Sequence, residues 1–170
     1  MPGHAPRLLT AIALVVALAA AALPPAVHFA LAYANLSATT ETRAGYLAVE
    51  LTRFISSNPS AWMYQQHRFE EIALRFPARD ESLVVRAAGG ERILQVGATP
   101  GRPALARSAP LHDSGTVVGT IEIECSMRPM LLATALAALA GLALGVAVFV
   151  TLRALQLRAL EAASSAGSRN

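Results

Sequence analysis

The sequence predicts a membrane protein in which two transmembrane helices flank an exported domain of the α+β class. Three observations lead to this prediction. Two long runs carry no charged side chain, the excess positive charge lies at the two ends of the chain, and the segment between the runs changes from helical to strand periodicity. A chain of 170 residues is too short for a large enzyme in addition to these parts.

The two uncharged runs cover residues 8–33 and residues 130–152. Each is long enough to cross a bilayer, which takes about 20 consecutive apolar residues. Pro24 and Pro25 interrupt the first run, but membrane helices tolerate proline better than soluble helices do. We therefore expect the first run to be an uncleaved, kinked anchor. Small residues near its end leave a cleaved signal peptide as the alternative.

The charge distribution predicts the orientation of the chain. Between residues 34 and 128, ten arginines balance ten acidic residues, so the net charge of +3 belongs to residues 1–7 and 153–170. By the positive-inside rule both ends are cytoplasmic and residues 34–128 are exported. The high pI therefore indicates topology. The sequence has no basic stripe with interleaved aromatic residues, so we expect no nucleic-acid partner.

The first half of the exported segment has helical periodicity. One helix is predicted to continue out of the first apolar run and to end near Ser57, because the residue before a proline avoids the α region. A second helix is predicted to begin at Asn58-Pro59, a favourable N-cap followed by a favourable first position. The apolar face of the first helix consists of Ala44, Leu47, Leu51 and Phe54.

The second predicted helix has a core face and a polar face. Tyr64, His67 and Arg68 on the polar face are candidate ligand-binding residues, because a guanidinium beside an imidazole and a phenol can hold an anionic ligand or a partner. A solvated helix face is the alternative. The core face consists of Trp62, Phe69, Ile72, Ala73 and Phe76.

The second half of the exported segment has strand periodicity. Gly89-Gly90 suits a tight hairpin between the first two strands. The last strand alternates cleanly, which is typical of a half-buried antiparallel strand. We expect the helices to pack on one face of a small antiparallel sheet. The predicted strands are residues 82–87, 92–96, 105–111 and 116–124, and the core positions of the last are Val117, Gly119, Ile121 and Ile123.

Two stretches resemble the N-terminal periplasmic sensor region of bacterial membrane-bound signalling proteins, namely GGDEF-type diguanylate cyclases and sensor histidine kinases. They are residues 55–76, ISSNPSAWMYQQHRFEEIALRF, and residues 112–139, HDSGTVVGTIEIECSMRPMLLATALAAL. The resemblance implies a PAS-like sensor of the Cache kind between two spans. It also implies a bacterial inner-membrane location with a periplasmic central domain, an unidentified periplasmic ligand and a cytoplasmic output domain.

Signatures of the output domains and of other chemistry are absent from the sequence. It contains no GGDEF or EAL motif, no phospho-acceptor histidine box, no clear HAMP domain, no P-loop and no dinucleotide fingerprint. His67 with Glu71, or His112 with Asp113, supplies too few ligands for a metal site. We therefore expect a non-enzymatic chain without metal or cofactor. We expect it to be a fragment, a truncated product or a stand-alone partner of an output protein.

The second apolar run carries a stripe of small residues at every fourth position. Such a stripe lets two helices approach closely, and it predicts a homodimer, although a run so rich in alanine can show it by chance. A short apolar seam beyond the run predicts a dimeric signalling helix. The stripe consists of Ala133, Ala137, Gly141 and Gly145, and the seam includes Leu152, Leu155 and Ala159.

These observations predict a membrane-anchored sensor module in which a shift of the exported sheet moves the second span. Cys125, the single cysteine, is predicted to be a small half-buried residue just before that span. The alternative is a small membrane subunit whose exported domain binds another protein.

Overall fold

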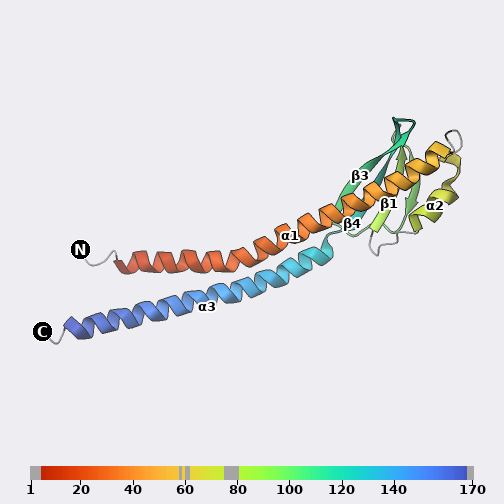
Figure 1. Cartoon of the computed structure of the whole chain (residues 1–170). Helices are drawn as coiled ribbons and strands as arrows, with labels where there is room; N and C mark the ends of the chain where they lie inside the picture. Colours follow the sequence, from red (N-terminus) through yellow and green to blue (C-terminus); the bar gives the residue numbers. More distant parts are fainter. Residues whose placement is uncertain (1–4, 58, 60–61, 75–80, 168–170) are drawn as a thin grey trace. The chain divides into compact units, whose positions relative to one another are not determined.

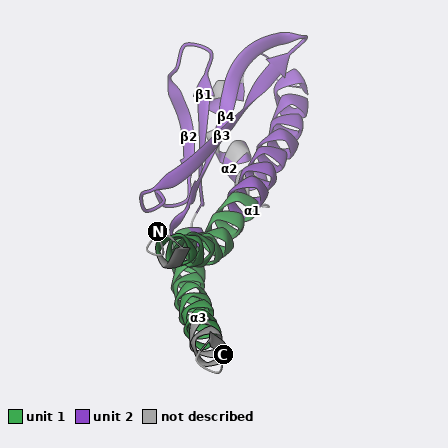
Figure 2. Ribbon diagram, turned by 90° about the vertical axis from the view of Figure 1, so that its left-hand side faces the viewer, with its two compact units in different colours: residues 1–31, 131–170 green, residues 32–130 purple. Residues whose placement is uncertain are grey.

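The computed structural model describes residues 5–57, 59, 62–74 and 81–167. Two compact units emerge, one of residues 1–31 with 131–170 and one of residues 32–130 (Figure 2). The elements are α1 (Ala5–Ser57), a 3₁₀ turn η1 (Trp62–Tyr64), α2 (Gln66–Leu74), β1 (Glu81–Ala87), β2 (Arg92–Val96), β3 (Ala104–Asp113), β4 (Thr116–Ser126) and α3 (Arg128–Gly167) (Figure 1).

The two long helices, α1 and α3, are each long and apolar enough to cross a membrane. α1 continues through Pro24 and Pro25 and past the end of the first apolar run into the second unit. It ends at Ser57, two residues before Pro59, as predicted. The sequence therefore predicted both apolar helices and the extension of the first one correctly.

The four strands form one antiparallel sheet with the order β2-β1-β4-β3. β1 pairs with β2 through a tight turn in which Gly90 has a φ of 85°. β3 pairs with β4 through Ser114 and Gly115, whose φ values of 49° and 86° suit a primed hairpin turn. The sheet confirms the four predicted strands, and β3, predicted from a weak pattern, is ten residues long.

The core of the second unit lies between α1 and one face of the sheet (Figures 1 and 2). The amphipathic face of α1 supplies large aliphatic side chains, and the central strands supply β-branched ones. Leu51 is 1% exposed and lies among them. The central members of this core are Leu47, Leu51, Ile55, Trp62, Leu83, Val85, Leu111, Ile121 and Ile123. The predicted helix-on-sheet layering is confirmed for α1.

The alternation predicted for β4 fails at one end. Gly119, Ile121 and Ile123 are buried as expected, but Val117 is exposed and Val118 packs against the core. The pairing of β3 with β4 is irregular between Leu111 and His112. Such a bulge shifts the alternation by one residue, so the side chain that faces the core changes from odd to even numbers.

The second predicted helix is not one continuous helix. A 3₁₀ turn and α2 replace it, and they meet at Gln65. Gln65 N donates to the Trp62 carbonyl at 3.2 Å, which closes the 3₁₀ turn. Trp62 is 4% exposed and Ile72 packs against the core, as predicted. Phe76, Asn58 and the side chains of Phe69 and Ala73, which belonged to the same predictions, lie outside the described residues.

Candidate functional site

The polar face of α2 and the preceding turn carry the candidate ligand residues, and all three are exposed. Tyr64 is 83% exposed. Arg68 and His67 both approach Glu71 on their own helix, at 3.1 Å and 3.8 Å. The positions of these side chains are those of a solvated helix face, which was the alternative interpretation. Binding by Tyr64, His67 and Arg68 stays a prediction.

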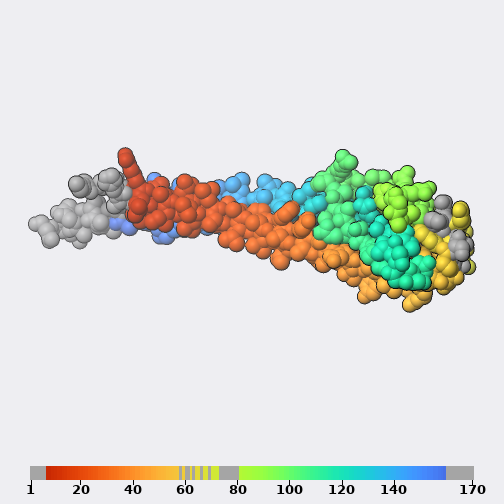
Figure 3. All heavy atoms as spheres, turned by 90° about the horizontal axis from the view of Figure 1, so that it is seen from above, coloured from red at the N-terminus to blue at the C-terminus, as the bar shows by residue number. Residues whose placement is uncertain are grey.

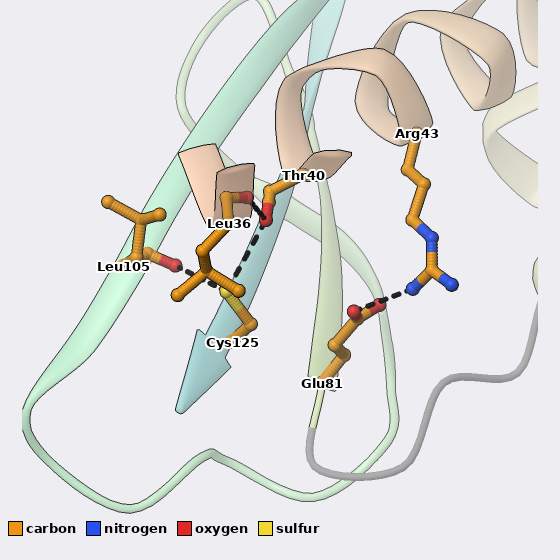
Figure 4. A network of polar contacts seen from close by, with 6 residues as sticks. All are labelled: Leu36, Thr40, Arg43, Glu81, Leu105 and Cys125. Atoms are coloured by element: carbon orange, nitrogen blue, oxygen red, sulfur yellow. Dashed lines mark hydrogen bonds and ion pairs between the residues drawn. The ribbon is translucent and has the colours of Figure 1, made fainter. Parts of the chain in front are cut away.

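Several polar contacts between α1 and the sheet gather at one end of the sheet, which we call the root of the sheet. The root lies where α1 enters the second unit and where β4 leaves for α3. Its residues are Ser37, Thr40 and Arg43 on α1 with Glu81, Arg107 and Cys125 on the strands. Figure 4 shows the part of this network around Thr40 and Arg43.

The centre of the root is a buried contact between a hydroxyl and a thiol. Thr40 donates to the Leu36 carbonyl at 2.8 Å, and its Oγ1 lies 3.4 Å from Cys125 Sγ (Figure 4). The thiol also reaches the Leu105 carbonyl at 3.6 Å. Cys125 was predicted to be half-buried, but it is buried. Its position at a core register of β4, opposite Leu105, explains the difference.

Two arginine contacts flank this centre. Arg43 Nη1 donates to Glu81 Oε1 at 2.6 Å, an ion pair between α1 and the first residue of β1 (Figure 4). Arg107 on β3 donates to Ser37 Oγ at 2.7 Å. The root thus joins α1 to β1, β3 and β4 through charged and polar groups. The far part of the same interface is mainly apolar, with one hydrogen bond from His112 N to Thr52 Oγ1 at 3.2 Å.

The first unit contains a helix pair in which the predicted small residues do bring two helices close together. In the space-filling view α1, in red to orange, lies over α3, whose blue atoms are visible along its edge (Figure 3). Gly141 and Gly145 are buried, and a Cβ on either would collide with α1 at Ala21 or Ala17. Both helices belong to the same chain. The sequence predicted that these glycines would contact a second copy of the chain, but here they contact α1 of the same chain. Homodimerisation stays a prediction, and these two glycines do not support it.

The other members of the stripe contribute less. Ala133 is exposed and Ala137 is only half-buried, so the close approach is limited to the two glycines. On the seam, Leu152 is half-buried, while Leu155 and Ala159 are exposed. The exposed part of the seam is therefore Leu155 and Ala159, and dimerisation through the seam stays a prediction.

Polar contacts between α1 and α3 lie near both ends of the helix pair. His28 Nδ1 lies 3.0 Å from Thr134 Oγ1. At the opposite end Arg153 Nη1 donates to Thr10 Oγ1 at 2.8 Å, and Gln156 Nε2 donates to the Leu9 carbonyl at 3.0 Å. Residues 10 and 28 are 18 positions apart on one helix, which corresponds to about 27 Å.

Sequence reasoning missed these contacts. His28 is the one histidine in the first apolar run, and a polar residue within an apolar run was the signal that could have located its partner. Arg43 and Glu81 gave no comparable signal, because they are 38 residues apart and are brought together only by the pairing of α1 with the sheet.

Within the described residues, no group of three or more histidine, cysteine or acidic side chains is placed to hold a metal ion. No protein-family model matches this chain, and no curated protein matches it. The family of sensor regions suggested by the sequence therefore stays a resemblance.

Proposed function

We propose that this protein is a membrane-anchored extracytoplasmic sensor module that transmits a change in its exported domain across the inner membrane. The observation that carries the proposal is the continuity of the chain at the root of the sheet. α1 belongs to both units, and α3 begins two residues after the end of β4. A change of packing between α1 and the sheet therefore has two helical routes out of the domain.

The helix pair supports the membrane part of the proposal. Its polar contacts are separated by about 27 Å along α1, close to the thickness of about 30 Å of a bilayer hydrocarbon core. Large side chains such as Leu132 and Leu136 point outward, and the glycines point inward. Lipid tails solvate leucine as well as a protein core does, so association there depends on close packing of small residues.

The sheet unit supports the sensor part. A long helix across one face of an antiparallel sheet is compatible with the PAS-like, Cache-like domain that the resemblance implies. The exposed seam residues Leu155 and Ala159 suit a homodimer in the cytoplasm.

A partner-binding subunit is the second candidate, and one surface of the sheet unit favours it. Tyr46 and Val49 lie three residues apart on the outer face of α1 and are both exposed. Exposed apolar side chains on one helix face are a common partner contact. If the protein is a partner-binding subunit, substituting both residues with serine should abolish binding of the partner protein. If it is a sensor of a small ligand, the same substitutions should leave sensing unchanged.

Topology is tested with a reporter enzyme that is active only after export. Inserted between Gly89 and Gly90 it should be active, and fused after Asn170 it should be inactive. Activity at both positions would show that α3 does not cross the membrane and would contradict the location that we propose.

Transmission is tested by loosening the exported core and reading the far end of α3. In a Cys125→Ala background, a cysteine at Leu155 is labelled with a maleimide, with and without Leu51→Ala. The rate should change about threefold or more if packing changes reach the seam. An unchanged rate in a protein whose sheet has measurably loosened would contradict signal transmission.

A further inference from the structure

The loop between β2 and β3, residues 97–103, lies against the junction where β4 passes into α3. One residue, Met127, separates the two elements. Three hydrogen bonds connect the loop to the junction, and we call this loop the clasp. The bonds run from Met127 N to the Pro103 carbonyl (2.9 Å), from Ser126 Oγ to the Gly101 carbonyl (3.1 Å) and from Arg128 Nε to the Arg102 carbonyl (3.1 Å).

A further hydrogen bond connects the end of β4 to the first residue of α3. The backbone N–H of Arg128 donates to Ser126 Oγ at 3.3 Å, while that hydroxyl donates to the clasp. The first N–H groups of a helix have no partner within the helix, so a side chain that accepts from one of them stabilises the helix start. Ser126 therefore connects the clasp and the first turn of α3 through one hydroxyl.

Gly101 leaves room for the arginine side chain that crosses the clasp. A Cβ at position 101 would lie 2.7 Å from Cζ and 2.9 Å from Nε of Arg128. These atoms are the far end of a flexible side chain, so an alanine here would displace the guanidinium and leave the loop backbone in place. Gly101 and Arg128 form one contact that a change at either residue breaks.

The other end of the clasp touches the strand that binds α1. Gly97 has a φ of +86°, and a Cβ there would collide with the backbone carbonyl of Glu81. The side chain of Glu81 is the partner of Arg43. The clasp therefore extends from the attachment point of α1 to the first turn of α3.

We propose that the clasp fixes the first turn of α3 to the end of the sheet and is the point where a change in the sheet is passed to α3. The first part stands on the contacts alone, and the second part rests on the proposed function. A change in the sheet that moves residues 97–103 breaks the bonds to Met127 and Arg128 and frees the start of α3. The clasp thus provides two discrete arrangements, closed and open.

The test is amide hydrogen exchange at Met127 in the full chain, measured by NMR in lipid nanodiscs. Gly101→Ala and Arg128→Ala should each accelerate this exchange about fivefold to tenfold, because each removes one hydrogen bond that holds the clasp closed. The double variant should exchange no faster than either single variant, because both changes break the same contact.

Two matched controls accompany these variants. Gly89→Ala adds a methyl group where nothing lies within 4 Å, and Arg102→Ala removes a side chain but keeps the carbonyl that Arg128 uses. Both should leave Met127 exchange unchanged. Protection of the Val85 and Ile121 amides reports that the sheet stays folded in every variant.

Unchanged exchange in both single variants, or additive effects in the double variant, would overturn the closed clasp. The transmission part has its own readout, the maleimide labelling of a cysteine at Leu155. If Leu51→Ala alters that labelling and Gly101→Ala does not, the clasp is not the point of transmission, although the proposed function stands. If neither alters it, the proposed function fails, and the Met127 result still decides whether the clasp holds α3.

Discussion

The two units of this protein place leucine in opposite positions. In the sheet unit Leu51 is 1% exposed, and the outer face of α1 carries charged residues such as Arg43 and Arg53 together with Tyr46 and Val49. In the helix pair Leu136 is 68% exposed, and glycine and alanine occupy the contact between the helices. One helix, α1, follows both arrangements along its length. This difference is the one that our proposal predicts, in which water surrounds the sheet unit and lipid surrounds the helix pair.

The largest expected difference in stability is between truncating a leucine in the sheet unit and truncating one in the helix pair. Leu51→Ala should destabilise the sheet unit by about 2–5 kcal/mol, because it leaves a cavity in a packed core. Leu136→Ala should cost under about 0.5 kcal/mol, since the side chain contacts no packed core. Hydrogen exchange of the full chain in nanodiscs measures both. Equal costs would remove the contrast between the units.

A smaller effect is expected from enlarging the helix contact. Gly141→Leu should destabilise the helix pair by about 1–3 kcal/mol, because the new side chain has to displace the backbone of α1 at Ala21. Ala138→Leu is the control, since Ala138 is exposed on the same helix. Exchange protection of α1 amides near Ala21 reports the change. If both variants behave alike, the glycine does not set the distance between the helices.

The polar contacts at the root of the sheet should contribute less to the free energy of unfolding than the helix contact does. Arg43→Ala should cost about 0.5–1 kcal/mol, because the ion pair with Glu81 is partly exposed to water. Arg53→Ala is the matched control, as its partner Glu50 lies on the same helix and both are exposed. A double-mutant cycle with Glu81→Ala measures the coupling. A coupling energy of zero would mean that the pair does not hold α1 to β1.

The smallest effect concerns the polar face of α2. Arg68→Ala should change stability by under about 0.5 kcal/mol, because the side chain is exposed and its ion pair among the described residues is with Glu71 on its own helix. Thermal unfolding of the full chain measures it. A loss of several degrees would show that Arg68 has a structural contact beyond Glu71 and would remove it from the candidate ligand residues.

Sequence patterns predicted elements better than contacts between elements. The apolar runs and the core of α1 around Leu51 follow from periodicity, since burial on one face repeats at the helical period. The bulge at Leu111 and the break at Gln65 do not change periodicity enough to be seen beforehand, so Val117 and the second helix were wrongly predicted. The partner of Gly141 depends on how two helices pair in space, which a single helix pattern does not contain.

The same limit applies to the candidate site. Tyr64, His67 and Arg68 were selected for their chemistry, yet the contacts that join elements are Arg43 with Glu81 and the clasp. Those contacts involve ordinary polar residues far apart in sequence. The packing of α1 on the sheet brings Arg43 to Glu81, and the antiparallel pairing of β3 with β4 brings the clasp to the end of β4.

Cysteine labelling in intact cells tests the central contrast most directly. In a Cys125→Ala background, single cysteines replace Tyr64 and Leu136, which are 83% and 68% exposed. A membrane-impermeant maleimide should label position 64 and not position 136, because lipid covers the second site. A third cysteine at Leu155 should be labelled only after the cells are permeabilised. Equal labelling at positions 64 and 136 would show that water surrounds both units, and would contradict the membrane account.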